Sequence, residues 1–282
     1  MLVIYSFMEK LIEMLINTRV LRAFPKLHLS LLVKNIGCKE EEMYIIKSLC
    51  DENKLSVDIG GYVGDYSFHM AKHSRWCHVF EPRPEAVDRI EEKIDGMSLP
   101  ITVHEVALSD SKGEMKLRIA SECPERSTLE EGNSLEKFGE NKVDVPVRRL
   151  DDFDLREVGC IKIDVEGHEL SVLEGAINTI RRDKPSLIIE SEERHRKGAV
   201  DEMVSLLEPL GYESYFIKNG KIKNIDKFDA YEDQVSMING KYIHNKTEYI
   251  NNFIFIAEKY SKDIDLCINQ LMKDLRRNEI TD

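Results

Sequence analysis

The sequence lacks any long uncharged hydrophobic run. A helix needs about 18 or more consecutive apolar residues to cross a bilayer, and no such stretch occurs. The apolar start of the chain is interrupted by Glu9, Lys10 and Glu13, and no small-residue cleavage site follows it. We therefore expect neither a membrane span nor a secretory signal peptide.

Paired cysteines and an excess of basic charge are also missing. The six cysteines, at positions 38, 50, 77, 123, 160 and 267, form no CxxC pair. This pattern indicates reduced thiols of a cytoplasmic protein rather than a disulfide framework or a zinc ribbon. The chain has 40 Lys plus Arg against 52 Asp plus Glu, a net charge of -12. Such an acidic surface argues against nucleic acid as a partner.

What the 282 residues do contain is an alternation of short apolar runs with amphipathic segments. Residues 1–53 have helical spacing and are interpreted as an N-terminal helical extension. Residues 54–260 are predicted to form the main domain, and 261–282 a C-terminal helix. Within the main domain, strands are predicted at 55–60, 76–80, 101–108, 160–164, 186–190, 212–217 and 251–258, and helices at 65–72, 84–94, 169–182 and 198–210. This alternation predicts an α/β fold with a doubly wound, mostly parallel sheet.

Residues 114–149 have a different pattern. Two runs, at 115–119 and 143–148, alternate apolar and polar side chains as half-exposed strands do. They flank an irregular stretch, 121–141, that is rich in glutamate. We expect this stretch and the N-terminal helices to close over the cofactor and to shape the acceptor pocket.

The end of the first predicted strand carries a glycine-rich turn, in which Asp58 precedes Gly60, Gly61 and Gly64. Glycines let a ligand approach the backbone, and a helix start offers free N–H groups. Glu81 ends the next strand, where a carboxylate can accept both hydroxyls of an adenosine ribose. NAD and S-adenosylmethionine (SAM) both fit. The spacing is not GxGxxG, and a carboxylate at the mouth of the loop suits the ammonium and sulfonium of SAM better than a pyrophosphate.

Four segments together resemble the FkbM-type methyltransferases: residues 56–67, 79–84, 106–110 and 161–170. The resemblance extends through 173–176, 184–185 and 188–190, and covers about residues 55–190 plus the closing strand at 252–256. It implies a class I, SAM-dependent fold with a Rossmann-like sheet of seven strands, the last one antiparallel. It also implies methylation of a hydroxyl, often on a sugar or a natural product.

The resemblance and the strand ends together indicate which residues bind the cofactor. Glu81 would hold the ribose, and Ala107 would lie near the adenine. The family usually has Ala-Asn after the first glycine, whereas this chain has Gly61-Tyr62. The complete cofactor-binding set that we expect is Asp58, Gly60, Gly61, Gly64, Glu81, Pro82, Ala107 and Asp164.

Candidate catalytic groups follow the strand at 160–164. Methyl transfer to an alcohol needs alignment of the two reactants and a base for the hydroxyl proton. Asp164 would face the sulfonium, His168 has the best intrinsic pKa for a base, and Glu166 is either a base or a helix-start carboxylate. In a rival mechanism Asp164, Glu190 and Glu192 would bind Mg²⁺. Nothing in their spacing demands a metal, and we assign none.

The sequence thus predicts a SAM-dependent O-methyltransferase acting on a small-molecule or glycan acceptor. A NAD-dependent dehydrogenase and a non-catalytic binding protein of the same fold are the alternatives. Acceptor contacts are expected from residues 1–53, 121–142 and 219–250, and the apolar N-terminal helices offer a surface for a homodimer. The charge run 192–197 is predicted to be a solvated loop.

Overall fold

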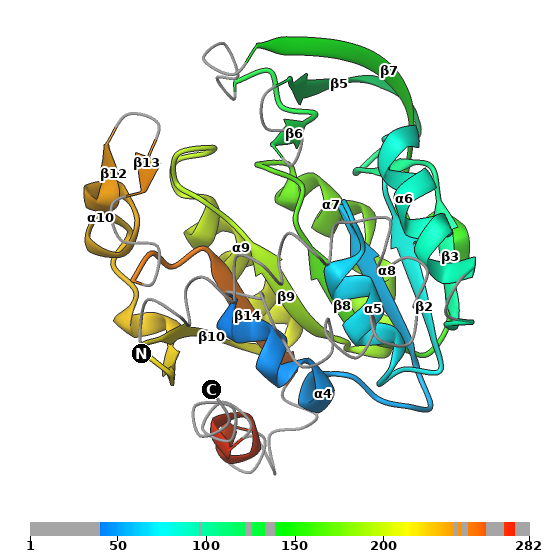
Figure 1. Ribbon diagram of the computed structural model, residues 1–282. Helices are drawn as coiled ribbons and strands as arrows, with labels where there is room; N and C mark the ends of the chain where they lie inside the picture. The colour runs from blue at the N-terminus through cyan, green and yellow to red at the C-terminus, as the bar shows by residue number, and fades with distance from the viewer. Residues whose placement is uncertain are drawn as a thin grey trace, which may run out of the picture.

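An eight-stranded sheet runs through the protein in this computed structural model, which describes residues 40–95, 98–121, 126–132, 139–239, 242–243, 248–257 and 268–273 (Figure 1). The strand order is β11-β10-β14-β9-β8-β1-β2-β3. In chain order these strands are β1 (Leu55–Ile59), β2 (Trp76–Phe80), β3 (Ile101–His104), β8 (Val158–Ile163), β9 (Ser186–Glu190), β10 (Tyr212–Lys218), β11 (Lys221–Asn224) and β14 (Asn252–Ala257).

The central strands are parallel because helices connect them. β3, β2, β1, β8 and β9 pair in parallel, whereas β14 pairs antiparallel with both β9 and β10. All six residues of β8 and of β14 are buried, as expected for strands that are covered on both faces. The predicted doubly wound sheet with an antiparallel last strand is thereby confirmed. The expected number of seven strands is wrong, because β11 adds an eighth by a hairpin with β10.

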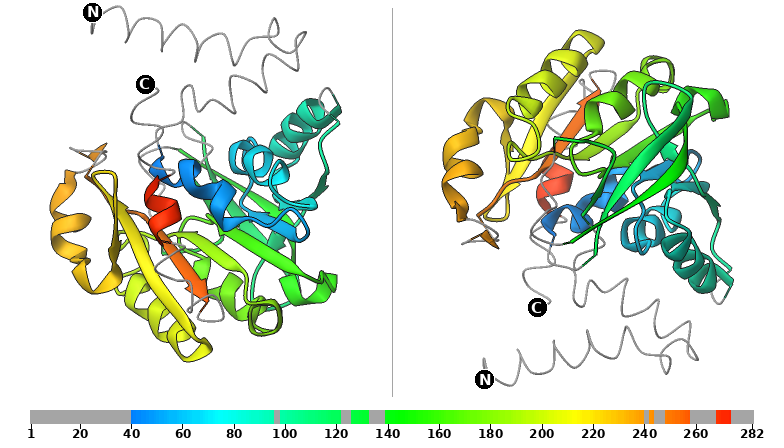
Figure 2. Two further views of the ribbon diagram at one scale, coloured as in Figure 1. Left: turned by 90° about the horizontal axis from the view of Figure 1, so that it is seen from below. Right: turned by 90° about the horizontal axis from the view of Figure 1, so that it is seen from above.

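Two helical layers cover the sheet on opposite sides (Figure 2). One layer consists of η1 (Glu41–Ile45), α4 (Ile46–Leu49), α5 (Asp65–Ala71) and α6 (Pro84–Asp95). The other consists of α7 (Glu169–Gly175), α8 (Ile177–Asp183) and α9 (Ala199–Leu207). Successive side chains of a strand point to opposite faces. Accordingly Ile161 and Ile163 pack in the core under α7 to α9, while Cys160 packs in the core under α4 to α6.

Several predicted elements are divided differently in the structure. The predicted strand 101–108 is split, because β3 ends at His104 and β4 (Ala107–Leu108) joins another sheet. The predicted helix 169–182 is interrupted at Ala176 between α7 and α8. Residues 268–273 are helical, as the predicted terminal helix requires. Residues 1–39, and with them the expected N-terminal helices, their closure over the cofactor and the homodimer, lie outside the described residues. The domain boundaries stay a prediction.

A second sheet, ordered β4-β7-β5-β6, stands beyond the carboxyl ends of the central strands (Figures 1 and 2). Its long strands are β5 (Gly113–Ala120) and β7 (Glu140–Arg148), and β6 (Ser127–Thr128) pairs with β5. Arg118 of β5 links this sheet to the loop after β6. It pairs with Glu140 of β7 at 2.8 Å and donates to the carbonyl of Glu130 in that loop at 2.7 Å. Within the described part of the chain, none of the helices has the length and apolar character needed to cross a membrane.

The close packing of the turn after β1 against the end of β8 can be tested by substituting Gly60. Gly60 has φ +82°, and a Cβ there would lie 1.8 Å from the carbonyl oxygen of Asp164. Gly198 has a similar φ of +80° but open space around it. Gly198→Ala should therefore cost about 1–2 kcal/mol for the left-handed backbone alone. Gly60→Ala should cost a further 1–3 kcal/mol, roughly, because of overpacking.

Urea unfolding of the two variants measures this difference. Equal destabilisation would show that the close approach between the ends of β1 and β8 can relax without cost.

Candidate active site

A pocket of about 290 Å³ opens at the carboxyl ends of β1, β2, β8 and β9, where the second sheet covers them. Leu117 of β5, Ser127 of β6 and Leu129 line it from that sheet, so part of the irregular stretch 121–141 does border the site. The other lining residues are Glu40, Ile59, Gly60, Tyr62, Phe80, Glu81, Pro82, Arg83, Ala107, Leu108, Asp164, Val165, Glu166 and Glu190.

The glycine turn shapes one wall of this pocket. The amide of Asp164 donates to the carbonyl of Ile59 at 2.9 Å, which brings the ends of β8 and β1 together at Gly60. Gly61 and Gly64 do not line the pocket. A Cβ on Gly61 would lie 2.3 Å from Cγ1 of Val79, and Gly64 has φ +87°. These two glycines therefore serve packing and backbone conformation.

Asp58 lies behind the wall rather than at the mouth of the loop, where the sequence had placed it. Its side chain is on buried β1, is 2% exposed, and accepts a hydrogen bond from the hydroxyl of Ser67 on α5. Burial raises the pKa of Asp58 to about 6. The position follows from the strand's alternation, which turns this residue toward α5 and away from the pocket.

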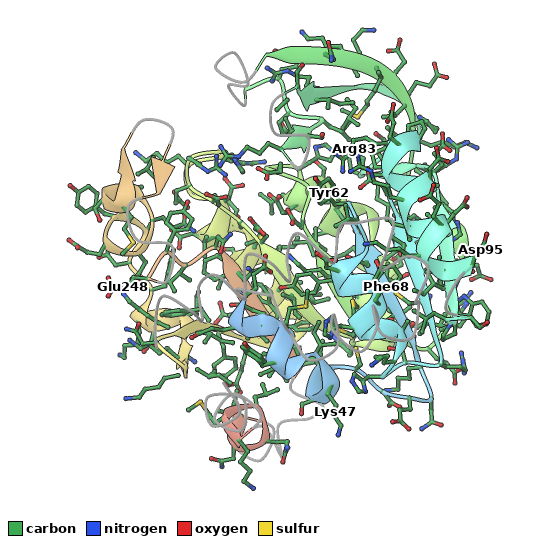
Figure 3. The ribbon with its side chains drawn as sticks, viewed as in Figure 1. Lys47, Tyr62, Phe68, Arg83, Asp95 and Glu248 are labelled. Carbon is green, nitrogen blue, oxygen red and sulfur yellow. The ribbon has the colours of Figure 1, made fainter. Side chains whose placement is uncertain are left out.

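Glu81 lines the pocket as predicted, and its carboxylate already has several donors. Oε1 accepts from the amide and Nε of Arg83 at 3.0 and 2.8 Å, and Oε2 accepts from the amide of Tyr62 at 2.9 Å. Tyr62 has a left-handed φ of +46°, and its ring lies 4.9 Å from the guanidinium carbon of Arg83 (Figure 3). A longer contact, of 3.4 Å, joins Nη2 of Arg83 to Oε2.

Three carboxylates from two neighbouring strand ends meet in the pocket: Asp164, Glu166 and Glu190. Burial raises the pKa of each of them, that of Glu166 to about 8. Behind them lies the buried ammonium of Lys162, whose positive charge opposes this effect on Asp164 and Glu190. Asn251 donates to Glu190 at 2.8 Å. Such an array suits a cationic ligand, because a positive charge stabilises the ionised carboxylates.

His168, the predicted base, is held outside the pocket. Its Nδ1 lies 2.6 Å from Glu130 and its Nε2 lies 2.9 Å from the hydroxyl of Ser109. The ring is 5% exposed and does not line the pocket. Both nitrogens are therefore engaged in joining the start of α7 to Ser109, directly after β4, and to Glu130, in the loop after β6. The structure gives His168 a structural place, in contrast to the role predicted from its intrinsic pKa.

Residues 192–195 contribute buried and half-buried side chains beside the pocket, in contrast to the solvated loop predicted for 192–197. Glu192 is 3% exposed and bonds Nε and Nη2 of Arg194 at 2.5 and 2.6 Å. Nε2 of His195 lies 3.1 Å from Oε2 of the pocket residue Glu166. The only sequence signal for this arrangement is that the run follows directly on the carboxyl end of β9, where a doubly wound sheet binds its ligands.

Three side chains beside the pocket offer atoms of the kind that bind metal ions: Glu166, Glu192 and His195. These carboxylate oxygens and the imidazole nitrogen lie within 4.8 Å of one another. The guanidinium of Arg194 already supplies a positive charge there, because it bonds Glu192 and lies 3.8 Å from Glu166. Burial is the largest single effect on Glu192 and opposes its ionisation, but the hydrogen bond and charge of Arg194 together with His195 and Tyr249 outweigh it, so the pKa of Glu192 is lowered. The Mg²⁺ set considered from the sequence included Asp164 and Glu190 in place of Glu166 and His195.

A family model described as the methyltransferase FkbM domain matches residues 58–214. The chain belongs to the FkbM methyltransferase family. It is accordingly an enzyme that uses SAM, and the dehydrogenase and non-catalytic alternatives are set aside. The pocket agrees with that cofactor, since carboxylates that fit a sulfonium and an ammonium line it together with Gly60 and Glu81.

Individual relatives of this FkbM chain are distant. Methyltransferase sdnD of Sordaria araneosa is 27% identical over 67% of this chain and 82% of its own length. The hexuronic acid methyltransferase AglP of Haloferax volcanii is 20% identical over 53% of this chain and 61% of its own. A crystal structure of a methyltransferase FkbM from Methylobacillus flagellatus has a TM-score of 0.48 and 17% identity, and covers 78% of this chain and 51% of that chain. This chain thus spans about half of that FkbM chain.

Removal of the His168 ring should affect stability more than chemistry. His168→Leu removes the hydrogen bond that the imidazole makes to Ser109 and the one that it makes to Glu130. This should cost about 1–3 kcal/mol of unfolding free energy, measured by urea denaturation. His168→Gln, whose amide can replace one bond, should cost less. Normal stability together with lost turnover would return His168 to the chemistry.

Proposed function

We propose that this enzyme transfers the methyl group of SAM to a hydroxyl of a small polar or glycosidic acceptor bound in the pocket. The observation that carries the proposal is the convergence of Asp164, Glu166 and Glu190 in the pocket that Gly60 and Glu81 also line. The cofactor supplies an electrophilic methyl group on a cationic sulfur. The chain has to align a hydroxyl with it and to take up a proton.

The proposed cofactor site follows the pocket wall. Glu81, Pro82 and Ala107 would bind the adenosine end, and Gly60 and Asp164 the methionine end. A ribose hydroxyl at Glu81 would take the place of the 3.4 Å contact between Nη2 of Arg83 and Oε2. The remaining members of the predicted set, namely Asp58, Gly61 and Gly64, would act from behind the wall by supporting the turn.

The proposed acceptor class rests on the polarity of the pocket. Carboxylate oxygens make strong hydrogen bonds to hydroxyl groups, so Asp164, Glu166 and Glu190 favour a ligand with several hydroxyls. The relative from Haloferax volcanii is named for a hexuronic acid, which supports a sugar-like acceptor for this chain as well. The acidic pocket disfavours a strongly anionic ligand such as a nucleic acid.

Mass spectrometry tests this proposal directly. The enzyme is incubated with methyl-labelled SAM and pools of glycosides and small alcohols, and the products are fragmented to locate the label. We expect the label on a hydroxyl oxygen. Label found only on nitrogen or on carboxylate oxygens would contradict the proposed reaction.

Glu81→Gln tests the ribose contact. The change keeps the shape of the side chain but removes the charge that assists its hydrogen bonds. SAM binding should weaken by about 1.5–3 kcal/mol, measured by calorimetry. Glu85→Gln, at an exposed position of α6, is the matched control and should bind normally. Unchanged affinity of the Glu81 variant would remove this residue from the site.

Asp164→Asn tests the orientation of the reactants. Loss of one charge-assisted hydrogen bond, worth about 1.5–3 kcal/mol, should lower kcat by about tenfold to a hundredfold with the fold intact. Asp201→Asn on the exposed side of α9 should have no effect. Turnover that EDTA abolishes and Mg²⁺ restores would instead make Asp164 and Glu190 metal ligands.

A further inference from the structure

We infer that Glu166 accepts the proton of the acceptor hydroxyl, and that His195 is the positioning residue that holds its carboxylate. The inference deepens the proposed function and rests on it. As the hydroxyl oxygen bonds to the methyl carbon, the carbon–sulfur electron pair stays on sulfur. The hydroxyl proton moves to a carboxylate oxygen of Glu166, so charge and atoms balance without a further reactant.

The backbone at Glu166 is fixed in an unusual conformation at the edge of the pocket. Its φ is +51°, in the left-handed region that non-glycine residues seldom adopt. The hydroxyl of Thr128 on β6 donates to its carbonyl at 2.7 Å. Residues held in such conformations cluster at functional sites, because the surrounding structure has to enforce them. Here the enforcing contact comes from the second sheet, which also covers the pocket.

His195 provides the second contact. Its Nε2 lies 3.1 Å from Oε2 of Glu166, and its side chain is 11% exposed. Burial lowers the pKa of His195 to about 4, so the ring is neutral near pH 7 and carries one N–H. We assign that proton to Nε2, because a carboxylate oxygen is its partner. The ring then donates to Glu166 and favours its ionised form.

The ionisation of Glu166 depends on charges from several elements. Burial and the neighbouring carboxylates raise its pKa to about 8, and Arg194 opposes them. Glu166 is thus ionised, and able to take a proton, only as the pH rises through this region. A bound sulfonium would stabilise the ionised form and lower that pH. The charged and titratable groups around the pair are Asp164, Glu169, Glu190, Glu192, Arg194 and Arg126, with Tyr249 bonded to Glu192.

The other candidate bases are less available. Both nitrogens of His168 are engaged by Ser109 and Glu130 away from the pocket. The charge of the buried Lys162 opposes the rise in the pKa of Asp164 and Glu190, and Glu190 already accepts a hydrogen bond from Asn251 at 2.8 Å. Arg194 bonds Glu192 at 2.5 Å and lies 3.8 Å from Glu166.

The pH dependence of kcat separates these roles. The assay uses methyl-labelled SAM with a mixture of neutral and uronic methyl glycosides, from pH 5 to 10, on the full chain. Four variants are compared: Glu166→Gln, His195→Leu, His195→Gln and the control Glu169→Gln. Glu169 is a buried carboxylate of the same turn with a pKa raised to about 7 by burial, but it accepts from the amide of Gly167 and does not line the pocket.

Glu166→Gln should lower kcat by about 10²–10⁴-fold, the usual effect of losing a positioned base, while calorimetry still detects SAM binding. His195→Leu removes a donor to the carboxylate. It should lower the rate at pH 7 by about tenfold and move the acid limb of the profile to higher pH. His195→Gln keeps an N–H donor and should restore most of the rate. Glu169→Gln should keep most of the rate, and it should move the limb to lower pH, opposite to His195→Leu, because it removes a negative charge that raises the pKa of Glu166.

If the wild type labels a hydroxyl and Glu166→Gln has near-normal turnover, the inference about Glu166 is wrong, whereas the proposed function stands. The same holds if His195→Gln, correctly folded by circular dichroism, loses as much rate as His195→Leu, or if EDTA abolishes wild-type turnover and Mg²⁺ restores it. A wild-type enzyme that labels no hydroxyl would overturn both the inference and the proposed function.

Discussion

The ammonium of Lys162 is the charge on which the active-site end of the sheet depends. It is 1% exposed on the central strand β8, donates to the side chain of Asn252 at 3.2 Å, and lies 4.9 Å from the ring centre of Tyr66. Burial disfavours the charged form, but carboxylates led by Asp164 and Glu190 outweigh it and raise the pKa. An isolated buried charge is very costly. The ammonium and the carboxylates therefore have to be buried together, which fixes their positions relative to one another.

This arrangement leaves the pocket with more carboxylates than nearby cations. Asp164, Glu166 and Glu190 all have raised pKa values because of burial, so protons partly compensate their charge. A cationic cofactor in the pocket would take over that role and favour release of the protons. The positive charge of the methyl donor would thus have two effects. It would attract the donor to the ionised carboxylates, and it would keep a carboxylate ionised so that it can act as a base.

The second sheet contributes more than a cover. Ser109, His168 and Glu130 form a chain of hydrogen bonds from β4 through the start of α7 to the loop after β6. Thr128 holds the carbonyl of Glu166. Polar residues near a helix start can thus look catalytic in a sequence although their partners are structural. The turn from Asp164 to His168 has both kinds of residue, since Asp164, Val165 and Glu166 line the pocket, whereas His168 bonds Glu130 and Ser109.

The sequence by itself determined where the buried strands lie along the chain, where the glycine turn lies and which carboxylates follow the strand ends. These features are local patterns of apolar runs and the polar residues that end them. It could not find β11, whose residues Lys221–Asn224 become a strand only through the edge of β10. Tertiary structure alone decided that Asp58 is turned to Ser67, that His168 bonds Ser109, and that His195 reaches Glu166. These contacts join residues of different elements, so their geometry depends on how the helices and the second sheet pack on the central one.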